Sequence, residues 1–437
     1  MIAPAVGDPL PAPTAPNEML VIPAGDTGTI TIPDGYAYVV YSGTGSLTGG
    51  TGTFIVGDLN YSGGAPSVLA SDPTNTIASN INDTASGAQI ILSGGANNAV
   101  MASGAGDAFT IDGAGSGTVT ATGAGDTFNM AGGSYLLYAL GGASVTQSAG
   151  SSTVVASVAA VDMNASGGNV AFFAGTSADS VATSGSTTLT FLGGGGIDTL
   201  MAQGSADTVY AGSAGLVYQG GSGSDLFVAG PTSNVTLTGA AQETIYGNAG
   251  TSTWNLSNTS QAYFGAGGGT DNVTLGATAA ASIWGNNNES LSVSGGSGTP
   301  GGTQIVAFGE ADNINLSAAN GGNAVVMWNA EVGTQAFTGN TTLVASGAGN
   351  DSVVMFSASQ FGASPGPAHT ITVSNWQASD VFDLSFAQDS NGNYLAGYTA
   401  ADAASATTQL AAGSSFTLSD GTTVVFQGAK PTTIAHI

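Results

Sequence analysis

The sequence predicts an all-β protein: a parallel β-solenoid of the β-roll or β-helix type, with about 18 residues per coil. Three observations lead to this fold. Short alternating apolar runs bounded by Gly, Pro and Asp, such as residues 29–32 and 36–41, are typical of strands. Glycine supplies 70 of the 437 residues, enough to build a turn after every strand. Acidic residues recur at steps of 18 or 19, as from Asp207 to Asp225 and from Asp107 to Asp126.

The elements follow in a simple order along the chain. Residues 1–18 contain five prolines and predict an extended arm. The arm, followed by the expected strand at residues 27–32, either donates to the open edge of a neighbouring molecule or remains a tail. Residues 19–100 predict a β-rich N-terminal region, and residues 101–355 the glycine-rich solenoid repeats. Residues 366–437 predict a C-terminal β cap, and the tract around Ala400 to Leu410 is the one expected helix.

Each repeat has a small-residue turn, an acidic residue, any residue and then an apolar residue. Side chains alternate along a strand, so the apolar residue two positions after each acid is expected to point inward. The polar residue between them, for example Thr199, Thr208 or Asn272, is expected to face solvent.

The charge balance excludes several classes of partner. The chain carries 27 Asp and Glu against one cation, Lys430, for a net charge of -26. One cation cannot neutralise a phosphate backbone or an anionic lipid surface, so nucleic-acid binding is excluded and membrane attachment disfavoured. There is no cysteine, and no apolar run approaches the length of a membrane helix, so membrane insertion is not expected either.

Two nine-residue segments, 193–201 and 220–228, fit the pattern G-G-x-G-x-D-x-U-x completely. In these segments the chain resembles the hemolysin-type calcium-binding repeats of RTX-like, type I-secreted proteins. The resemblance implies Ca²⁺ held between stacked turns by carboxylates and backbone carbonyls. Carried over by position, the ligands are the carboxylates of Asp198 and Asp225 and the carbonyls of Gly193, Gly195, Gly220 and Ser222, with Asp207 and Asp351 as weaker candidates.

The alternative is that each acid only caps a turn by accepting hydrogen bonds from backbone N–H groups. The two complete matches are 27 residues apart, which predicts opposite edges of a two-sided coil. We therefore expect a few Ca²⁺ ions rather than a continuous ladder.

The C-terminal segments 370–376, 380–384 and 416–426 resemble the closing region of type I-secreted repeat proteins. The resemblance implies an uncleaved C-terminal secretion signal, which agrees with an N-terminus that has neither a basic residue nor an apolar core. The alternative is a plain β cap that covers the open end of the solenoid, and both roles are compatible.

Together these features predict a secreted structural protein, not an enzyme, that assembles with copies of itself at the bacterial surface as a layer, fibre or biofilm matrix. Acidic, cysteine-free composition also resembles that of surface-layer proteins.

The alternative is an adhesin or carbohydrate-binding module, with cell-surface glycans as partners. Ice binding is less favoured because the Thr-x-Thr pairs do not follow the coil period. A polysaccharide-acting enzyme is least favoured, because Asp380 and Asp383 are a nominal carboxylate pair that would face opposite sides of a strand. Four tryptophans could stack on sugars but are expected to complete the core or an interface: Trp254, Trp284, Trp328 and Trp376.

Overall fold

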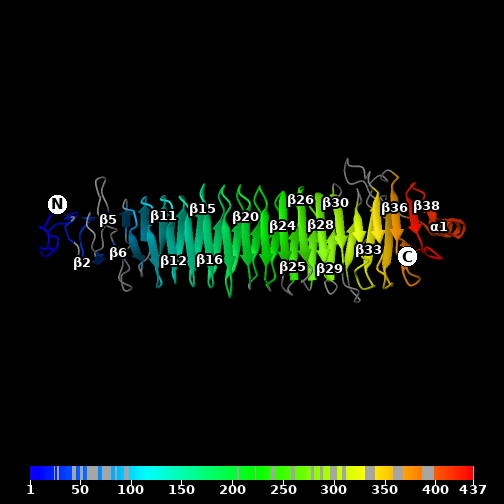
Figure 1. Ribbon diagram of the computed structural model, residues 1–437, viewed down its shortest axis with the longest axis horizontal. Helices are drawn as coiled ribbons and strands as arrows, with labels where there is room; N and C mark the ends of the chain where they lie inside the picture. The colour runs from blue at the N-terminus through cyan, green and yellow to red at the C-terminus, as the bar shows by residue number, and fades with distance from the viewer. Residues whose placement is uncertain are drawn as a thin grey trace. The chain divides into compact units, whose positions relative to one another are not determined.

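The computed structural model describes residues 1–23, 25–26, 29–41, 46–49, 53–56, 67–70, 80–83, 86–92, 98–203, 206–221, 223–237, 242–256, 261–276, 280–285, 289–295, 303–307, 312–329, 340–357, 368–385 and 398–436. These residues belong to two compact units, unit 1 from Met1 to Ala214 and unit 2 from Gly215 to Ile437. Each unit is a parallel β-solenoid, so the predicted fold class is confirmed. Within each unit the strands follow one another in chain order (Figure 1).

Unit 1 alternates between two sheets, because the chain turns after every strand and places the next strand on the opposite side of the coil. Sheet A of unit 1 contains β1 (Met19–Ile22), β3 (Tyr38–Tyr41), β5 (Thr53–Val56), β7 (Asn80–Asp83), β9 (Asn98–Ala102), β11 (Ser116–Ala121), β13 (Ser134–Ala139), β15 (Ser151–Ala156), β17 (Asn169–Phe173), β19 (Thr188–Leu192) and β21 (Thr208–Tyr210). Sheet B of unit 1 contains β2 (Thr29–Ile32), β4 (Ser46–Gly49), β6 (Ser67–Ala70), β8 (Gln89–Leu92), β10 (Ala108–Ile111), β12 (Asp126–Met130), β14 (Ala143–Gln147), β16 (Val161–Ala165), β18 (Ser180–Thr183) and β20 (Asp198–Ala202).

The register of unit 1 gives the coil length directly. Ala108 in β10 pairs with Thr127 in β12, 19 residues later, and Ser116 in β11 pairs with Ser134, 18 residues later. The parallel pairing already begins at Met19, which pairs with Tyr38. Each pairing described in this unit is parallel, so residues at the same position of successive coils form rows that run across a sheet.

Unit 2 repeats the same two-sheet design. Its sheet A contains β23 (Leu226–Val228), β25 (Gln242–Tyr246), β27 (Gln261–Gly265), β29 (Ala280–Trp284), β31 (Gln304–Ala307), β33 (Ala324–Asn329), β35 (Ser352–Ser357), β37 (Val381–Leu384) and β40 (Ala435–His436). Its sheet B contains β22 (Leu216–Gly220), β24 (Thr232–Leu237), β26 (Thr251–Leu256), β28 (Gly269–Leu275), β30 (Glu289–Ser294), β32 (Asn313–Asn315), β34 (Thr341–Val344), β36 (Thr370–Ser374), β39 (Thr423–Gln427) and β38 (Ser415–Thr417). Coils lengthen toward the C-terminus, where Asn323 and Asp351 occupy the same position 28 residues apart.

Inward-facing apolar side chains fill each coil and stack on their counterparts in the next. In unit 1 the rings of Phe109 and Phe128 stack with centroids 4.6 Å apart and an interplanar angle of 9°. In unit 2 the buried ring of Trp254 packs edge-on against Phe227 and Phe264. Such ring pairs contribute about 0.5–1.5 kcal/mol each beyond the area they bury. The solenoid therefore has a continuous core within each unit although no coil has a core of its own.

The proline-rich N-terminal arm lies against its own chain. Ile2 forms a parallel bridge with Leu20, and the buried Tyr36 hydroxyl donates to the carbonyl of Pro11 at 2.5 Å. The strand expected as part of a donor segment, β2, pairs with β4 of the same molecule. In this structure the arm covers the first coil rather than extending away from it.

The C-terminal region ends in the predicted helix. Helix α1 (Ala400–Ala412) begins with a capping box, in which Asp402 N donates to Thr399 Oγ1 and Thr399 N donates to Asp402 Oδ2. The single cation of the chain, Lys430, donates to the carbonyls of Leu410 and Gly413 at the other end of the helix, where positive charge is favourable. β38 pairs antiparallel with β39 and ends the parallel series.

Candidate functional sites

The repeat acids point into the solenoid. In β20 the residues Asp198, Leu200 and Ala202 are buried, whereas Thr199 and Met201 are exposed. The same alternation holds along the repeats, so the predicted inward direction of the apolar residue two positions after each acid is confirmed. The acid itself shares that direction, and ten repeat acids are buried: Asp107, Asp126, Asp179, Asp198, Asp207, Asp225, Glu243, Asp271, Asp312 and Asp351.

Most of these carboxylates cap the preceding coil. Asp198 Oδ1 accepts the N–H of Asp179 at 3.0 Å, and Asp179 Oδ1 accepts the N–H of Val161 at 2.8 Å. In unit 2, Glu243 accepts the N–H of Asp225 at 2.9 Å and Asp351 accepts that of Asn323 at 3.0 Å. In each case the donor occupies the same position one coil earlier. The carboxylate thus satisfies an N–H that the diverging turn would otherwise leave without a partner in the ladder.

The second carboxylate oxygen often fastens the turn that leads into the strand. Asp179 Oδ2 accepts from Gly175 N at 3.1 Å, and Asp351 Oδ2 accepts from Ser346 N at 2.6 Å. Asp380, which was not among the repeat acids, does the same with Gln377 N at 2.7 Å. One carboxylate therefore joins a turn to the coil before it.

Burial changes the protonation of these groups. Desolvation raises the pKa of Asp107 and of Asp198 to about 6. The backbone hydrogen bonds that these carboxylates accept lower the pKa by less, and the neighbouring carboxylates of Asp126 and Asp179, respectively, raise it further. Desolvation likewise raises the pKa of Asp126, Asp179 and Asp380 above the ordinary value. The turn acids are thus poised to take up protons in mildly acidic solution.

The predicted calcium ligands are distributed over both sheets. Asp198 starts β20 in sheet B of unit 1, and Asp207 immediately precedes β21 in sheet A. In unit 2, Asp225 precedes β23 and Asp351 precedes β35, both in sheet A. Asp198 therefore leads into sheet B of unit 1 and Asp225 into sheet A of unit 2, and their location on opposite edges of one coil stays a prediction.

The remaining predicted ligands are backbone carbonyls. Gly193 and Gly195 lie in the turn before Asp198, Gly220 is the last residue of β22, and Ser222 lies outside the described residues. Backbone hydrogen bonds join this turn to the turns of the neighbouring coils. Gly195 N donates to Gly175 O of the preceding coil at 2.8 Å, and Gly194 O accepts from Ser213 N of the following coil at 2.9 Å.

Close stacking explains most of the glycines in this turn. A Cβ atom on Gly194 would lie 1.7 Å from the carbonyl oxygen of Gly175, and one on Gly196 would lie 1.9 Å from that of Ser177. The nearest atom to a Cβ on Gly195 would be 3.6 Å away, an ordinary contact. The glycine pattern therefore has a structural cause that does not involve a metal ion.

The arrangement around Asp198 suits a turn cap better than a calcium ligand. One of its oxygens accepts a backbone N–H, and its side chain faces the interior. Throughout the described ranges, no three His, Asp or Glu side chains gather into a metal-ligating group. The capping alternative is thus realised at Asp198, and calcium binding remains a prediction for solution measurements.

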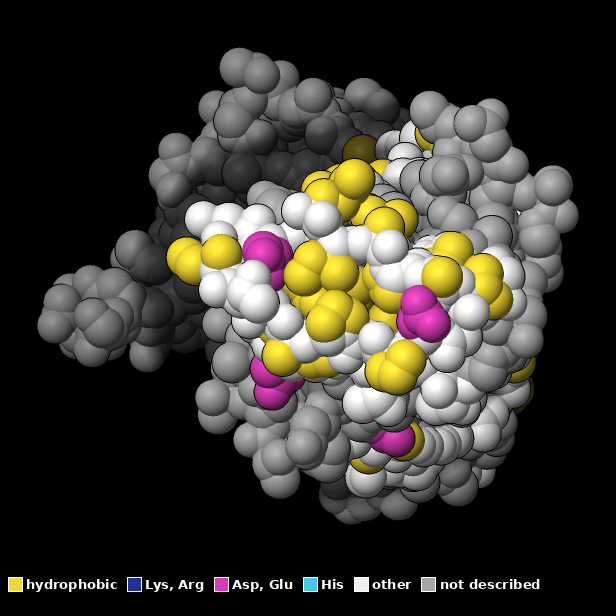
Figure 2. Space-filling model, turned by 90° about the vertical axis from the view of Figure 1, so that its left-hand side faces the viewer, with side chains coloured by type: hydrophobic (Ala, Val, Ile, Leu, Met, Phe, Trp, Pro, Cys, Tyr) yellow, Lys and Arg dark blue, Asp and Glu magenta, His cyan; other side chains and the backbone are white. Residues whose placement is uncertain are grey.

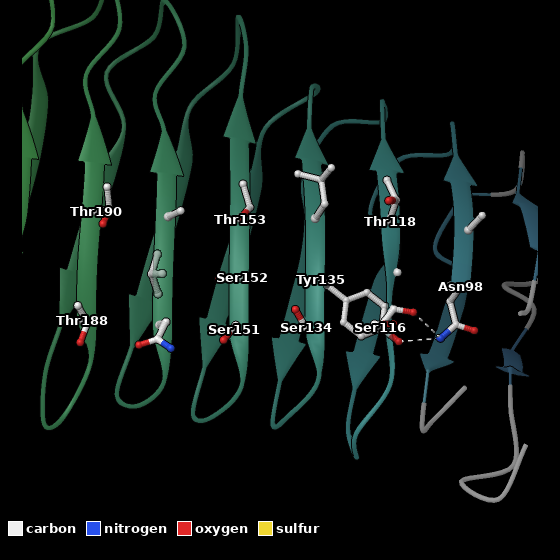
Figure 3. A pocket seen from close by; sticks show the side chains of 16 residues that line it. Asn98, Ser116, Thr118, Ser134, Tyr135, Ser151, Ser152, Thr153, Thr188 and Thr190 are labelled. Atoms are coloured by element: carbon white, nitrogen blue, oxygen red, sulfur yellow. Dashed lines mark hydrogen bonds between the residues drawn. The ribbon is translucent and has the colours of Figure 1, made fainter. Parts of the chain in front are cut away.

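The outer face of sheet A in unit 1 carries an open groove of about 740 Å³. Figure 3 shows its hydroxyl and amide side chains side by side on successive strands, with Tyr135 beside Asn98 and Ser116. Asn98 Nδ2 donates to the Tyr135 hydroxyl at 2.8 Å and to the carbonyl of Ser116 at 3.2 Å. A row of small polar groups lines the groove in register: Ser116, Ser134, Ser151, Asn169 and Thr188.

The neighbouring row does not form the threonine array that ice binding would need. Thr118 aligns with Leu136 and Thr153, and the row continues through Ala171 to Thr190. Apolar residues therefore interrupt the threonines.

An apolar row borders this groove on the same face. The register aligns Met101, Thr120, Tyr138, Val155, Phe173, Leu192 and Tyr210 on successive strands from β9 to β21. We call this row the apolar stripe. Four of its members are strongly exposed: Met101 at 58%, Phe173 at 39%, Leu192 at 38% and Tyr210 at 42%. Thr120 interrupts the row, and Tyr138 and Val155 are partly buried, but exposed apolar side chains that recur along one face are typical of a contact surface.

The end of unit 1 that contains the arm also presents apolar groups. Figure 2 shows hydrophobic side chains gathered on this end, with carboxylates around them. Met1 and Val6 are exposed there, and Gly7 N of the arm donates to Asp26 Oδ1 at 2.8 Å.

The tryptophans divide between core and surface. Trp254 and Trp376 are buried, as expected for residues that complete a core. Trp284 is largely exposed at the end of β29, so it does not complete the core, and the interface alternative stays a prediction for this residue. The side chain of Trp328 lies outside the described residues. The exposed Tyr246 and Tyr263 on nearby strands were not singled out from the sequence. Strand parity could have found them, because Ile245 and Phe264 occupy the alternate, buried positions.

Comparisons with protein-family models, with curated proteins and with solved structures find no match to this chain. None of the described helical residues form a segment with the length and hydrophobicity needed to cross a membrane.

Proposed function

We propose that this chain is a secreted structural protein that assembles with copies of itself into an extracellular layer, fibre or biofilm matrix. The apolar stripe on sheet A of unit 1 is the observation that carries this proposal. A solenoid built from repeating coils offers the same surface at regular intervals, which suits lateral packing of one molecule against another.

The charge distribution supports the choice of this face. From β9 to β21 the outward-facing residues of sheet A include no charged side chain, although the chain has a net charge of -26. Carboxylates elsewhere oppose association at neutral pH, so contact through an uncharged face costs least. Protons or Ca²⁺ would reduce the remaining repulsion between carboxylates and promote assembly. A secreted chain would encounter both in the extracellular medium.

Substitution within the stripe tests the proposal. The double variant Phe173→Ser and Leu192→Ser removes two exposed apolar groups and leaves the inward core of β17 and β19 in place. Sedimentation and negative-stain microscopy should show layers or fibres for the unmodified chain at pH 5 or with Ca²⁺, and mainly single molecules for the double variant.

Met201→Ser is the matched control, because Met201 is an exposed apolar residue on sheet B of the same unit. This control should assemble like the unmodified chain. Equal assembly of all three proteins, or monomers under every condition, would contradict the proposal.

A further inference from the structure

Three large aromatic side chains stand exposed on sheet A of unit 2. Tyr246 ends β25, Tyr263 lies in β27 and Trp284 ends β29, and their exposed fractions are 54%, 52% and 53%. We call these three residues the aromatic patch. Large aromatic groups on neighbouring strands remain in water at a cost that a bound partner would remove.

The strand register places the three rings close together. Tyr246 pairs with Gly265 and Gly265 pairs with Trp284, so Tyr246 and Trp284 share a row two strands apart, a separation of about 10 Å. Tyr263 lies on the strand between them in the adjacent row, where it pairs with Ser282. The patch is therefore a shallow triangle of rings on a sheet surface.

Glycine at position 265 keeps this surface open. A Cβ atom there would lie 3.6 Å from Cδ1 of Tyr246, so that ring extends toward the space that a larger residue would fill. The indole N–H of Trp284 donates to Ser282 Oγ at 3.2 Å, which holds the ring against its own strand. The ring of Trp284 thus has a local partner that orients it.

Hydrogen-bonding groups surround the rings. A hollow of about 220 Å³ lies beside Tyr263, with Gln261, Ser282 and Gln304 at its rim and alanines at its floor. Gln304 pairs with Ser282 and thus shares the row of Tyr263, and the amide of Gln242 donates to that of Gln261. Aromatic faces beside amides and a hydroxyl match a sugar ring, whose C–H face is apolar and whose edges carry hydroxyl groups.

The local charge selects the kind of sugar. The outward-facing residues described from β25 to β29, with Gln304 in β31, include no charged side chain, and Glu243 of β25 is buried. A chain with a net charge of -26 and one cation offers nothing to pair with a carboxylate or sulfate group. The surface therefore fits an uncharged glycan.

We propose that the aromatic patch binds an uncharged β-1,4-linked polysaccharide of the cellulose or chitin type. The rings of Tyr246 and Trp284 carry the faces of sugar units along one extended chain. Tyr263, Gln261 and Gln304 contact the ring and hydroxyl edges beside it. The apolar stripe of unit 1 differs because its most exposed members include Met, Phe and Leu, which suit a dry contact with protein.

The test uses the full chain at pH 8 with chelator, where carboxylate repulsion disfavours self-assembly. We expect retention on microcrystalline cellulose or on chitin beads and none on calcium-free alginate, an anionic control. Binding to only one of the two neutral polymers would identify whether the site takes cellulose or chitin. Trp284→Ala and Tyr263→Ala should each weaken retention by about tenfold or more. Tyr210→Ala, an exposed aromatic of unit 1, should bind like the unmodified chain.

Fluorescence provides a second measurement that does not depend on insoluble polymer. Cellohexaose or chitohexaose should change the tryptophan emission of the unmodified chain. The Trp284→Phe variant, which keeps an aromatic ring, should bind but lose most of that change. Absence of retention on both neutral polymers, equal retention by Trp284→Ala, or equal retention on alginate would overturn the site. Because assembly is measured separately with the stripe variants, such a failure would leave the structural role untouched.

Discussion

The buried turn acids predict that unit 1 becomes more stable as the pH falls from 8 to 5. Desolvation raises the pKa of Asp198 to about 6, from the ordinary value of 3.8 that applies in an unfolded chain. The folded state therefore binds this proton more tightly than the unfolded state does. The stability that it contributes is fully present below pH 3.8 and is lost as the pH rises through 6.

The size of the effect follows from the same two values. Proton linkage between a folded pKa of about 6 and an unfolded pKa of 3.8 gives about 1.4 kcal/mol of added stability at pH 5 relative to pH 8. Asp107, with a pKa of about 6, adds a similar amount. For a unit of roughly 200 residues each contribution corresponds to a rise of about 4 °C in Tm.

Asp198→Asn removes one of these contributions. The amide oxygen keeps accepting the N–H of Asp179, and the buried charge disappears. Thermal melts by circular dichroism at pH 8 and pH 5 should show that the variant gains about 4 °C less than the unmodified chain on acidification. The Phe173→Ser and Leu192→Ser background prevents assembly from adding to the measured stability.

Asp34→Asn is the matched control, because Asp34 is an exposed acid in the turn that follows β2 of the same unit. It removes the same charge and should keep the full pH dependence. A fall in Tm between pH 8 and pH 5, or an Asp198→Asn variant with an undiminished rise, would refute the assignment of the raised pKa to the buried turn acids.

Two further predictions concern the turns. Gly194→Ala should lower the Tm of unit 1 by several degrees, because its Cβ would meet the backbone of the preceding coil and such overpacking costs about 1–3 kcal/mol. Gly195→Ala should change the Tm little, and equal effects of the two substitutions would reject the stacking explanation. If Asp198 acts only as a turn cap, Ca²⁺ at pH 8 should raise the Tm of the Asp198→Asn variant as much as that of the unmodified chain; a rise confined to the unmodified chain would assign a Ca²⁺ ion to this turn.

The coil, and which of its side chains point inward or outward, could be predicted from the sequence because both depend on local rules. Alternation along a strand places Leu200 inside and Thr199 outside, and the acid spacing gives the coil length. The helix at Ala400–Ala412 was predictable for the same reason, since its signal is the local apolar period that buries Ala403, Ala406 and Leu410.

The role of the acids was not readable in this way. The pattern around Asp198 is compatible with a calcium ligand and with a turn cap, because both need glycine turns followed by a carboxylate. The partner that distinguishes them is the N–H of Asp179, which lies 19 residues earlier and reaches the carboxylate only after the coils have stacked. The same holds for Trp284, whose identity is compatible with a core residue and with an interface residue, because only its outward position on β29 excludes the core.

By itself, the sequence determined that this chain is a parallel β-solenoid, and its one cation among 27 acids predicts that it does not bind polyanionic partners. Those conclusions depend on alternation, period and charge, which neighbouring residues encode. Only the tertiary structure decided which side chains share a row, and so revealed the uncharged apolar stripe and the aromatic patch. Coil lengths differ, for example 15 residues between the paired Tyr38 and Thr53 and 30 between the paired Thr341 and Ile371, so a row across the sheet cannot be counted from a fixed repeat.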